Sequence, residues 1–484
     1  MQVEVSDAPL VEVDADVHAL GLCEGDSLPG ELSEMRGAGD VRATLERTTL
    51  LRADAPERLL VVGLGKREEL DAERLRIAAA LAANEAASYE ARRIAWALPE
   101  GAGELRERYA AAIVEGTLLA AFRFDRYKSH ADEDRPSVRL ERLILAGGDA
   151  ASFRDAVEVA AVASRAANRT RELQALPANV VTPSFLAERA TAIADEHDAV
   201  SATVLSRAEI ESRGMGGLAA VAKGSAEEPH LISLRYAGSG ADGPTLGLVG
   251  KAVTFDTGGI SIKPAAKMEE MKMDMSGGAA VLEALAAIAE LRLPLSVAAC
   301  VPAAENMPGG SATRPGDIIT QLNGKTVEIN NTDAEGRLIL ADALTYCVRE
   351  LGADRLVDVA TLTGGVLIAL GSTYAALVSN DDEWAGRVSA AAERSGELAW
   401  RLPLHPEYKA LTRGRDADLT NSSSKRKAST IYAASFLEEF VDGRPWAHLD
   451  IAGTAYDVGR AYVGTGPTGY GVRLLVELAR DLAG

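Results

Sequence analysis

Cysteine and histidine are scarce in this chain, and each scarcity argues against a class of function. The 484 residues include three cysteines, Cys23, Cys300 and Cys347, which lie far apart and form no CxxC pair. This argues against a disulfide framework and fits a reducing compartment. The six histidines form no HExxH motif and no i, i+4 pair, and only His448 lies in an apolar strand pattern, where a core role is favoured. Any metal site must therefore be built mainly from carboxylates.

Long apolar runs and an excess of basic residues are also missing. No uninterrupted apolar stretch is long enough to span a bilayer. The first residues lack the basic and apolar regions of a signal peptide. Asp and Glu number 71 against 51 for Lys and Arg, which gives a net charge of −20. This balance argues against nucleic acid as a partner, and we expect a cytoplasmic protein with no membrane association.

What the sequence does contain is a regular alternation of strand and helix patterns. Such alternation is typical of an α/β layer in which helices cover a sheet. In the first third, the predicted strands are 58–65, 92–98 and 139–147, and the predicted helices are 69–88 and 104–122. In the remainder, the predicted strands are 230–237, 245–256, 295–304, 355–363, 374–380 and 446–453, and the predicted helices are 276–291, 337–351, 382–396, 429–441 and 470–483.

The length exceeds what one ordinary core accommodates, so two α/β domains are expected. Residues 1–150 are predicted to form a smaller N-terminal α/β domain, and 151–173 an Ala-rich linker helix that prolines then terminate. Residues 174–484 are predicted to form the larger domain. Several of its strands are apolar throughout, which predicts a mostly parallel central sheet covered by helices on both faces.

Charged residues stand at the end of the strand predicted at 245–256. Lys251 lies between apolar neighbours, Asp256 ends the strand, and Lys263 follows a Gly-Gly turn. Ligands bind at the carboxyl ends of strands in α/β sheets, and a buried lysine must be either paired or neutral. A P-loop is disfavoured here, because the glycine spacing is wrong and alanine replaces the required Ser or Thr.

The octapeptide NTDAEGRL (331–338) places Asp333 and Glu335 one residue apart between a predicted strand and a predicted helix. On an extended backbone, two carboxylates at this spacing point the same way and can hold metal ions with help from elsewhere. An EF-hand would use Asn331, Asp333, Glu335 and Asp342, but a strand rather than a helix precedes the loop, which disfavours that interpretation.

Asp274 stands just before the SGGAA sequence that opens the helix predicted at 276–291. Taken alone, an aspartate in this position is favoured as a helix cap. A group of methionines surrounds it and could either fill the core or line an adaptable apolar pocket. These residues are Met268, Met271, Met273 and Met275.

Three segments taken together resemble one family, the leucyl aminopeptidases, also called cytosol aminopeptidases. They are VGKAVTFDTGGISIKP (249–264), MKMDMSGGAA (271–280) and NTDAEGRL, the last being the family's signature octapeptide. Weaker similarity extends over residues 174–484, whereas the first third is similar only in its general α/β character. The resemblance implies a two-metal exopeptidase that releases N-terminal leucine and other mostly apolar residues from peptides.

The resemblance also implies a set of metal ligands. Asp256 and Glu335 would bridge two divalent ions. Lys251, binding as a neutral amine, and Asp274 would complete one site, and Asp333 the other. Mn²⁺ or Zn²⁺ is expected, with Co²⁺ and Mg²⁺ as alternatives.

Lys263 and Arg337 are implied as catalytic groups that do not bind metal. Lys263 would stabilise the oxyanion formed when a metal-bridging hydroxide attacks the peptide carbonyl. Arg337 would hold a bicarbonate that acts as general base. The implied substrate-binding residues are Lys263, Met271, Asp274, Thr361, Leu362 and Ala452.

The expected partners are peptide substrates and further copies of the chain, since the family assembles as a homo-hexamer, a dimer of trimers. Two other classes compete with the peptidase interpretation: a metal-dependent hydrolase of a different substrate, and a non-catalytic binding protein on the same fold. The presence of Lys263 and Arg337 beside a complete ligand set favours the active peptidase.

Overall fold

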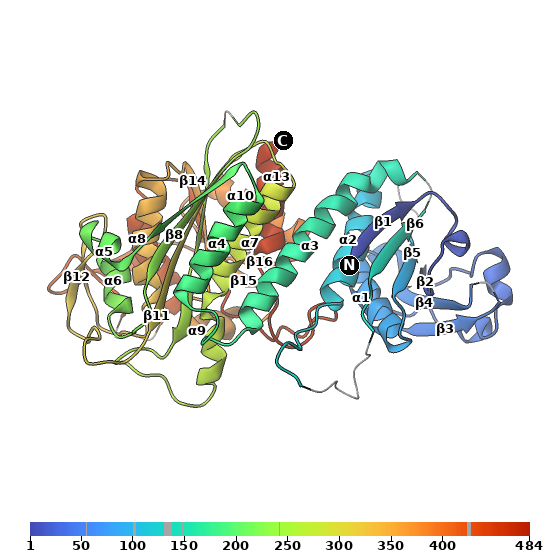
Figure 1. The fold of residues 1–484 in the computed structure, drawn as a ribbon, viewed down its shortest axis with the longest axis horizontal. Helices are drawn as coiled ribbons and strands as arrows, with labels where there is room; N and C mark the ends of the chain where they lie inside the picture. Colours follow the sequence, from blue (N-terminus) through green and yellow to red (C-terminus); the bar gives the residue numbers. More distant parts are fainter. Residues whose placement is uncertain (55, 100–102, 130–137, 148, 242, 424–426) are drawn as a thin grey trace. The chain divides into compact units, whose positions relative to one another are not determined.

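The computed structural model divides into two compact units (Figure 1). One contains Met1–Asn168 and Gly459–Gly464, and the other contains Arg169–Val458 and Thr465–Gly484. The division falls inside α3 (Arg154–Ala175), the helix that corresponds to the linker predicted at 151–173. The residues described are 1–54, 56–99, 103–129, 138–147, 149–241, 243–423 and 427–484.

The smaller unit is built on a sheet with the strand order β1-β6-β5-β2-β4-β3. Neighbouring strands are parallel except that β3 runs antiparallel to β4. The strands are β1 (Gln2–Ser6), β2 (Val17–Cys23), β3 (Thr48–Arg52), β4 (Arg58–Gly65), β5 (Arg93–Ala97) and β6 (Arg142–Ala146). The helices are α1 (Ala72–Ser88), α2 (Glu104–Ala120) and the 3-10 helices Leu10–Glu12, Gly30–Glu34, Ala38–Asp40, Arg67–Glu69 and Ala150–Phe153.

Local sequence signals explain how this unit is assembled. Asp71 caps α1, because its side chain accepts a hydrogen bond from the N–H of Arg74 at 2.9 Å. The apolar faces of α1 and α2 and the buried strands then form one core. The segment Gly459–Gly464 joins the unit through Tyr462, whose hydroxyl donates to Glu73 at 3.0 Å.

The larger unit is built on a sheet with the strand order β16-β15-β18-β14-β9-β11-β8-β7, and β10 pairs with β11. Its central strands, from β18 to β11, are parallel, whereas β15, β8 and β7 pair antiparallel at the two sides. The strands are β7 (Val200–Leu205), β8 (His230–Ala237), β9 (Leu246–Gly250), β10 (Ala252–Asp256), β11 (Ser296–Asn306), β14 (Arg355–Ala360), β15 (Ala375–Ser379), β16 (Ala399–Arg401) and β18 (Trp446–Asp450).

Helices cover both faces of this sheet. Figure 1 shows α4, α7 and α13 on one side and α8 on the other, and both α7 and α8 pack against β9 and β11. The helices are α4 (Pro183–Glu196), α5 (Arg207–Ser212), α6 (Gly216–Ala222), α7 (Ser276–Glu290), α8 (Gly336–Arg349), α9 (Gly364–Leu370), α10 (Asp382–Ser395), α11 (Pro406–Lys409), α12 (Ser429–Leu437) and α13 (Val472–Ala483). The 3-10 helices are η6 (Met268–Met275), η7 (Ala410–Thr412) and η8 (Glu438–Phe440). The predicted α/β class and mostly parallel central sheet are confirmed.

A small third sheet has the strand order β12-β13-β17, in which the strands are β12 (Ile318–Thr320), β13 (Thr326–Glu328) and β17 (Leu419–Thr420). The strand predicted at 245–256 is corrected, since β9 ends at Gly250 and β10 begins at Ala252. β9 pairs with both β11 and β14, whereas β10 pairs with β11 with a register shift. Lys251 lies at this break, and its N–H donates to the carbonyl of Val359 at 3.1 Å.

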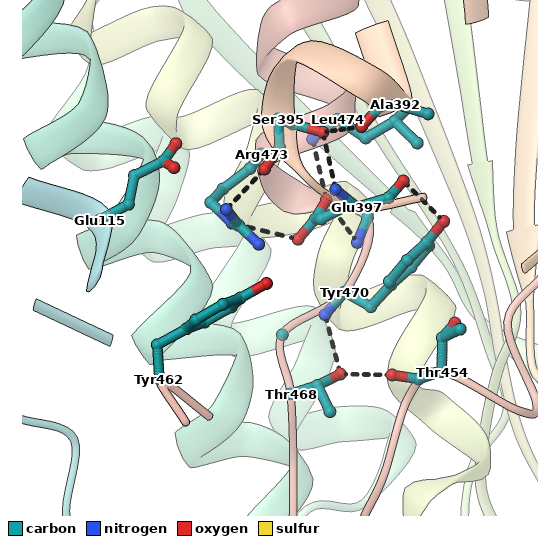
Figure 2. A network of polar contacts seen from close by, with 12 residues as sticks. Glu115, Ala392, Ser395, Glu397, Thr454, Tyr462, Thr468, Tyr470, Arg473 and Leu474 are labelled. Carbon is teal, nitrogen blue, oxygen red and sulfur yellow. Dashed lines mark hydrogen bonds and ion pairs between the residues drawn. The ribbon is translucent and has the colours of Figure 1, made fainter. Parts of the chain in front are cut away.

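A buried glutamate anchors the chain where it enters α13 (Figure 2). Oε2 of Glu397 accepts hydrogen bonds from the N–H groups of Gly471 and Leu474, both at 2.9 Å. Nε of Arg473 lies 3.4 Å from the other carboxylate oxygen. A negative charge at a helix N-terminus is stabilising, so Glu397 fixes the start of the last helix. Within the described part of the chain, none of the helices has both the length and the apolar character that a membrane span requires.

Candidate metal centre

Five charged side chains converge at the carboxyl ends of the central strands. Lys251 follows β9, Asp256 ends β10, and Asp274 lies on η6. Asp333 and Glu335 lie in the turn that leads into α8. Ligand sites in α/β sheets form at this edge, where several strands end together and their loops can supply side chains.

Oxygen atoms enclose the ammonium group of Lys251, which is almost completely buried. Nζ lies 2.7 Å from Asp274 Oδ2 and 2.9 Å from Glu335 Oε1, and it donates to the carbonyl of Thr361 at 3.0 Å. Burial opposes the charge, but the carboxylates outweigh it and raise the pKa of Lys251 above its usual range. Gly336 makes room for this side chain, because a Cβ there would lie 2.7 Å from Cε of Lys251. Of the two alternatives for a buried lysine, the structure shows the paired one.

Lys263 bridges the other two carboxylates. Its Nζ lies 2.7 Å from Asp256 Oδ2 and also forms an ion pair with Asp333. Burial opposes its charge, but Asp256, Glu335 and Asp333 outweigh that effect and raise its pKa. The lysine thus lies beside the carboxylate cluster with its ammonium group held in place.

The carboxylates themselves form a compact cluster. One oxygen from each of Asp256, Asp333 and Glu335 lies within 4.8 Å of the other two, and Asp274 meets the same Lys251 ammonium as Glu335. Oε2 of Glu335 is buried and has no hydrogen-bond partner among the residues described. An unpartnered buried carboxylate oxygen is costly unless a cation faces it. The donor set therefore fits divalent metal ions.

The pKa values of the carboxylates reflect the same crowding. Burial is the main cause of the raised pKa values of Asp274, which rises to about 8, and of Asp333, which rises to about 6. The pKa of Asp256 is also raised, first by burial and then by the negative charge of the neighbouring Glu335. Burial also acts on Glu335, but the two lysines outweigh it and lower its pKa. Since four carboxylates face two ammonium groups, negative charge is in excess, and bound cations would relieve it.

The backbone of NTDAEGRL is not extended, so that expectation is wrong. Glu335 has φ −76° and ψ −37°, which is right-handed helical geometry immediately before α8. Two residues earlier, the N–H of Asp333 donates to Oδ1 of Asn331 at 3.0 Å, which closes an Asx turn. The two carboxylates therefore meet through a turn and a helix start, and not through the alternation of a strand.

An asparagine that the sequence analysis missed orients Asp256. Nδ2 of Asn306 donates to Asp256 Oδ1 at 2.8 Å and to the carbonyl of Thr332 at 3.0 Å. The N–H of Gly258 donates to the same carboxylate oxygen at 2.9 Å. Asn306 is the last residue of β11, and this position at a strand end is the signal that could have identified it.

Arg337 lies buried in the first turn of α8. Its Nη1 donates to the carbonyl of Asn421 at 2.7 Å, and its guanidinium carbon lies 5.4 Å from the ring centroid of Tyr432. Burial lowers its pKa, and its Nε has no hydrogen-bond partner within the described ranges. One edge of the guanidinium is thus held by the protein while a donor is left for a ligand.

Asn421, also missed from the sequence, holds both the octapeptide and Arg337. Its side-chain oxygen accepts from the N–H groups of Asn330 at 2.9 Å and Asn331 at 3.3 Å. Its side-chain nitrogen donates to the carbonyls of Asn331 at 2.7 Å and Ala334 at 3.3 Å. No local sequence pattern reveals this role, because the partners lie far away along the chain.

The predicted pocket residues stand at two strand ends and on η6. Thr361 and Leu362 follow β14, and Ala452 follows β18. The N–H groups of Leu362 and Ala452 donate to one oxygen, Oδ1 of Asp450, at 3.1 and 3.2 Å. Met271 is half-buried on η6.

The structure decides between the alternatives that the sequence left open. The EF-hand is wrong, because β13 rather than a helix precedes the octapeptide, and Asp342 instead accepts from the N–H groups of Leu218 and Leu322 at 2.9 and 2.8 Å. The P-loop is wrong, because Lys251 is bound by carboxylates. The capping role of Asp274 is wrong as well, since the N-cap of α7 is Met275 and makes no side-chain cap bond.

The histidine in the apolar strand pattern is a core residue, as predicted. His448 is completely buried on β18, and its Nδ1 lies 2.6 Å from Oδ1 of Asp358 on β14. Among the methionines, Met275 is buried, whereas Met268, Met271 and Met273 on η6 are partly exposed. The three cysteines are free and buried.

Two family models match the chain. The model described as the catalytic domain of the cytosol aminopeptidase family covers residues 168–476, and the model of that family's N-terminal domain covers residues 21–131. A probable cytosol aminopeptidase from Roseiflexus castenholzii is 47% identical over 99% of both chains, and one from Solibacter usitatus is 45% identical over the same share.

A solved structure shows the same fold. The bottromycin maturation enzyme BotP, in complex with Mn, is 39% identical to this chain and superposes with a TM-score of 0.88. The match covers 97% of this chain and 100% of that one. The similarity therefore extends over both units.

Proposed function

The chain belongs to the cytosol aminopeptidase family and is a metal-dependent aminopeptidase, and on this premise we propose how its residues act. The preferred substrates are peptides that begin with leucine or another mostly apolar residue. The observation that most directly supports metal-dependent catalysis is the cluster of Asp256, Asp333 and Glu335 beside two fixed lysines, in which Oε2 of Glu335 has no hydrogen-bond partner among the described residues.

Side chains from three segments would hold two divalent ions per chain. Asp256 and Glu335 would serve both ions, Lys251 and Asp274 would complete one site, and Asp333 would complete the other. When bound, such ions polarise the peptide carbonyl and lower the pKa of a water molecule so that it can attack. Lys251 would act here as a neutral amine, because an ammonium group has no lone pair to offer. Bound cations would replace the proton that the carboxylates otherwise hold on this lysine.

Mn²⁺ and Zn²⁺ are the proposed ions, with Co²⁺ and Mg²⁺ as alternatives. The donors are mainly carboxylate oxygens, which suit hard and borderline divalent ions. The related BotP was solved in complex with Mn, which supports the first choice. A cytoplasmic location and assembly into a hexamer, as a dimer of trimers, complete the proposal.

Lys263 stabilises negative charge on the substrate's carbonyl oxygen. Its ammonium group is already held between Asp256 and Asp333, so little reorganisation is needed when that charge develops. The raised pKa keeps the lysine protonated, as this role requires. The free α-amine of the substrate is the group that selects N-termini, because an acylated nitrogen has lost its basic lone pair.

Arg337 would hold a bicarbonate, which would supply a general base beside the metal site. Asn421 and Tyr432 fix the guanidinium, and its Nε has no protein partner in the described part of the chain. Arginine suits a planar anion, because its donors form a rigid fork. Arg337→Ala should lower kcat and make the rate insensitive to added bicarbonate, whereas bicarbonate dependence that survives the substitution would exclude this role.

Hydrolysis of leucine p-nitroanilide with and without Mn²⁺ tests the proposed activity. The matched control is N-acetyl-leucine p-nitroanilide, which has the same side chain and leaving group but a blocked amine. We expect turnover of the free amine and none of the acetylated compound. Equal rates on both substrates would rule out an aminopeptidase mechanism of this kind.

A further inference from the structure

One carboxylate oxygen holds the two loops that follow neighbouring strands at the site. Asp450 is the last residue of β18 and is completely buried. Its Oδ1 accepts hydrogen bonds from the N–H groups of Leu362 at 3.1 Å, Thr363 at 3.4 Å and Ala452 at 3.2 Å. The loop after β14 and the loop after β18 therefore share one acceptor atom.

The second oxygen of the same carboxylate is also fixed. Oδ2 of Asp450 accepts from the hydroxyl of Thr363 at 2.6 Å. That hydroxyl oxygen lies 2.7 Å from the hydroxyl oxygen of Thr430 on α12. Because Thr363 donates to the carboxylate, Thr430 donates to Thr363. Both carboxylate oxygens are thus engaged, and the side chain cannot rotate without breaking several bonds.

The strand register explains why an acceptor is needed at this position. Ala360 pairs with Asp450 across β14 and β18, and each is the last residue of its strand. The N–H of Ile451 still donates to the carbonyl of Ala360, but the N–H groups of Leu362, Thr363 and Ala452, two or three residues beyond the strand ends, donate to Asp450 instead. A buried N–H without a partner costs free energy, and Asp450 satisfies three of them at once.

The loop after β14 also touches the metal ligands. Oγ1 of Thr361 donates to Asp274 Oδ1 at 2.7 Å, and the carbonyl of Thr361 accepts from Lys251 at 3.0 Å. Thr361 is therefore held from the metal side, whereas Leu362 and Ala452 are held by Asp450. The loop after β14 is thus held at two successive residues, at Thr361 by the ligand cluster and at Leu362 by Asp450, and the bonds to Asp450 join it to the loop after β18.

We propose that Asp450 is a positioning residue that sets the separation of the Leu362 and Ala452 loops, and through it the selectivity for the substrate's N-terminal side chain. The inference rests on the proposed function, in which these loops line the pocket for that side chain. Asp450 does not touch substrate. It acts by accepting hydrogen bonds from backbone N–H groups, so the selectivity depends on the position of its side-chain oxygens and not on its charge.

Two substitutions separate geometry from charge. Asp450→Asn removes the charge but keeps an acceptor in place for the three N–H groups, and its amide can donate to Thr363 while Thr363 donates to Thr430. Asp450→Glu keeps the charge but lengthens the side chain by one methylene, which pushes the loops out of position. Asp354→Glu is the matched control, because the same change is made at the opposite end of β14.

The readout is the ratio of kcat/KM for leucine p-nitroanilide to that for alanine p-nitroanilide. One methylene more or less in an apolar pocket changes kcat/KM by roughly 10- to 200-fold, so Asp450→Glu should change the ratio by about tenfold. Asp450→Asn and Asp354→Glu should leave it within about twofold. A merely structural defect lowers both rates equally and leaves the ratio unchanged. A shift in Asp450→Asn with none in Asp450→Glu would overturn the proposal.

Thr363→Val provides a second route if Asp450→Glu does not fold. It removes the hydroxyl that fixes Oδ2 while keeping the size of the side chain, and it should change the ratio in the same way to a smaller extent. If neither Asp450→Glu nor Thr363→Val, whichever of them folds, changes the ratio of the two kcat/KM values, the role of Asp450 is contradicted.

Amide hydrogen exchange tests the positioning without any activity. Peptides that cover residues 361–363 and 452 should exchange faster in Asp450→Glu than in the wild type and should stay protected in Asp450→Asn. If the wild type hydrolyses neither substrate, the proposed function fails while this measurement still decides the role of Asp450. Equal protection in all three proteins would overturn that role.

Discussion

Nζ of Lys251 lies 2.9 Å from Oε1 of Glu335, although both side chains are almost completely removed from solvent. Removing one partner of such a buried pair strongly destabilises the folded protein, because the other charge is left buried without compensation. Glu335 also belongs to the carboxylate cluster, where its second oxygen has no partner among the described residues. The pair thus joins the central sheet to the octapeptide at the point where metal ions are proposed to bind.

Removal of metal should abolish the activity reversibly. Prolonged dialysis against a chelator should reduce hydrolysis of leucine p-nitroanilide to background, because the attacking water then keeps its ordinary pKa. Added Mn²⁺, Co²⁺ or Zn²⁺ should restore turnover. Full activity in a preparation that elemental analysis finds free of metal would contradict the assignment.

Lys251→Arg should empty one of the two proposed metal sites. Arginine keeps the positive charge and the approximate length, but its guanidinium offers no lone pair to a metal. Elemental analysis of the purified variant should find one tightly bound ion per chain instead of two. Asp333→Asn is the matched comparison and should weaken mainly the other site. Two tightly bound ions in Lys251→Arg would show that Lys251 is not a ligand.

Lys263→Ala should lower kcat by about 10²-fold, the usual effect of removing one donor to a developing oxyanion. Metal content should be unchanged, because this lysine contacts the carboxylates without replacing any of them. Lys267→Ala is the control, since Lys267 lies on the same segment but is exposed. A kcat like that of the wild type in Lys263→Ala would exclude the proposed role.

Asn421→Ala should destabilise the fold by about 1–3 kcal/mol, the range for leaving buried polar groups unpaired. The truncation removes the partners of the Asn330 and Asn331 N–H groups and of two carbonyls. Urea unfolding measures the loss. Asn323→Ala, at a partly exposed position with similar backbone bonds, should cost less because water can replace them. Equal losses in the two variants would argue against a special role for Asn421.

The His448–Asp358 pair should make stability depend on pH. Burial opposes protonation of His448, but Asp358 outweighs it and raises the pKa above the ordinary value near 6.5. A histidine whose pKa is higher in the folded state stabilises the protein below its unfolded pKa, and the contribution is lost as pH rises through the folded pKa.

Urea unfolding at a series of pH values from about 5.5 upward tests this dependence. The difference in unfolding free energy between the wild type and His448→Asn isolates the pair, since asparagine can still donate to Asp358 but does not titrate. That difference should shrink as pH rises above about 6.5. A difference that stays constant across the range would contradict the raised pKa.

Sequence patterns alone were sufficient for the bounds of some strands. β4 (Arg58–Gly65) has the predicted bounds, because a continuous apolar run permits little else in a covered sheet. β8 (His230–Ala237) also has the predicted bounds, although Ser233 and Arg235 interrupt its apolar residues. The same patterns joined β9 and β10 into one strand. A single residue, Lys251, separates two apolar runs, and the change of pairing partner that divides them is invisible in the sequence.

The candidate site divides in the same way. The sequence singled out the charged residues by their place at strand ends and in the octapeptide, because such positions rarely carry buried charge without a ligand. For Asp274 the local pattern favoured a helix cap, whereas the family resemblance placed it with Lys251, and the tertiary structure shows the contact with Lys251. Only the tertiary structure decided that Asn306, Asn421 and Asp450 hold the surrounding loops. Their roles depend on hydrogen bonds between segments far apart in the chain. A one-dimensional pattern records the identity of a residue, whereas folding alone determines which distant donors and acceptors come within 3 Å of each other.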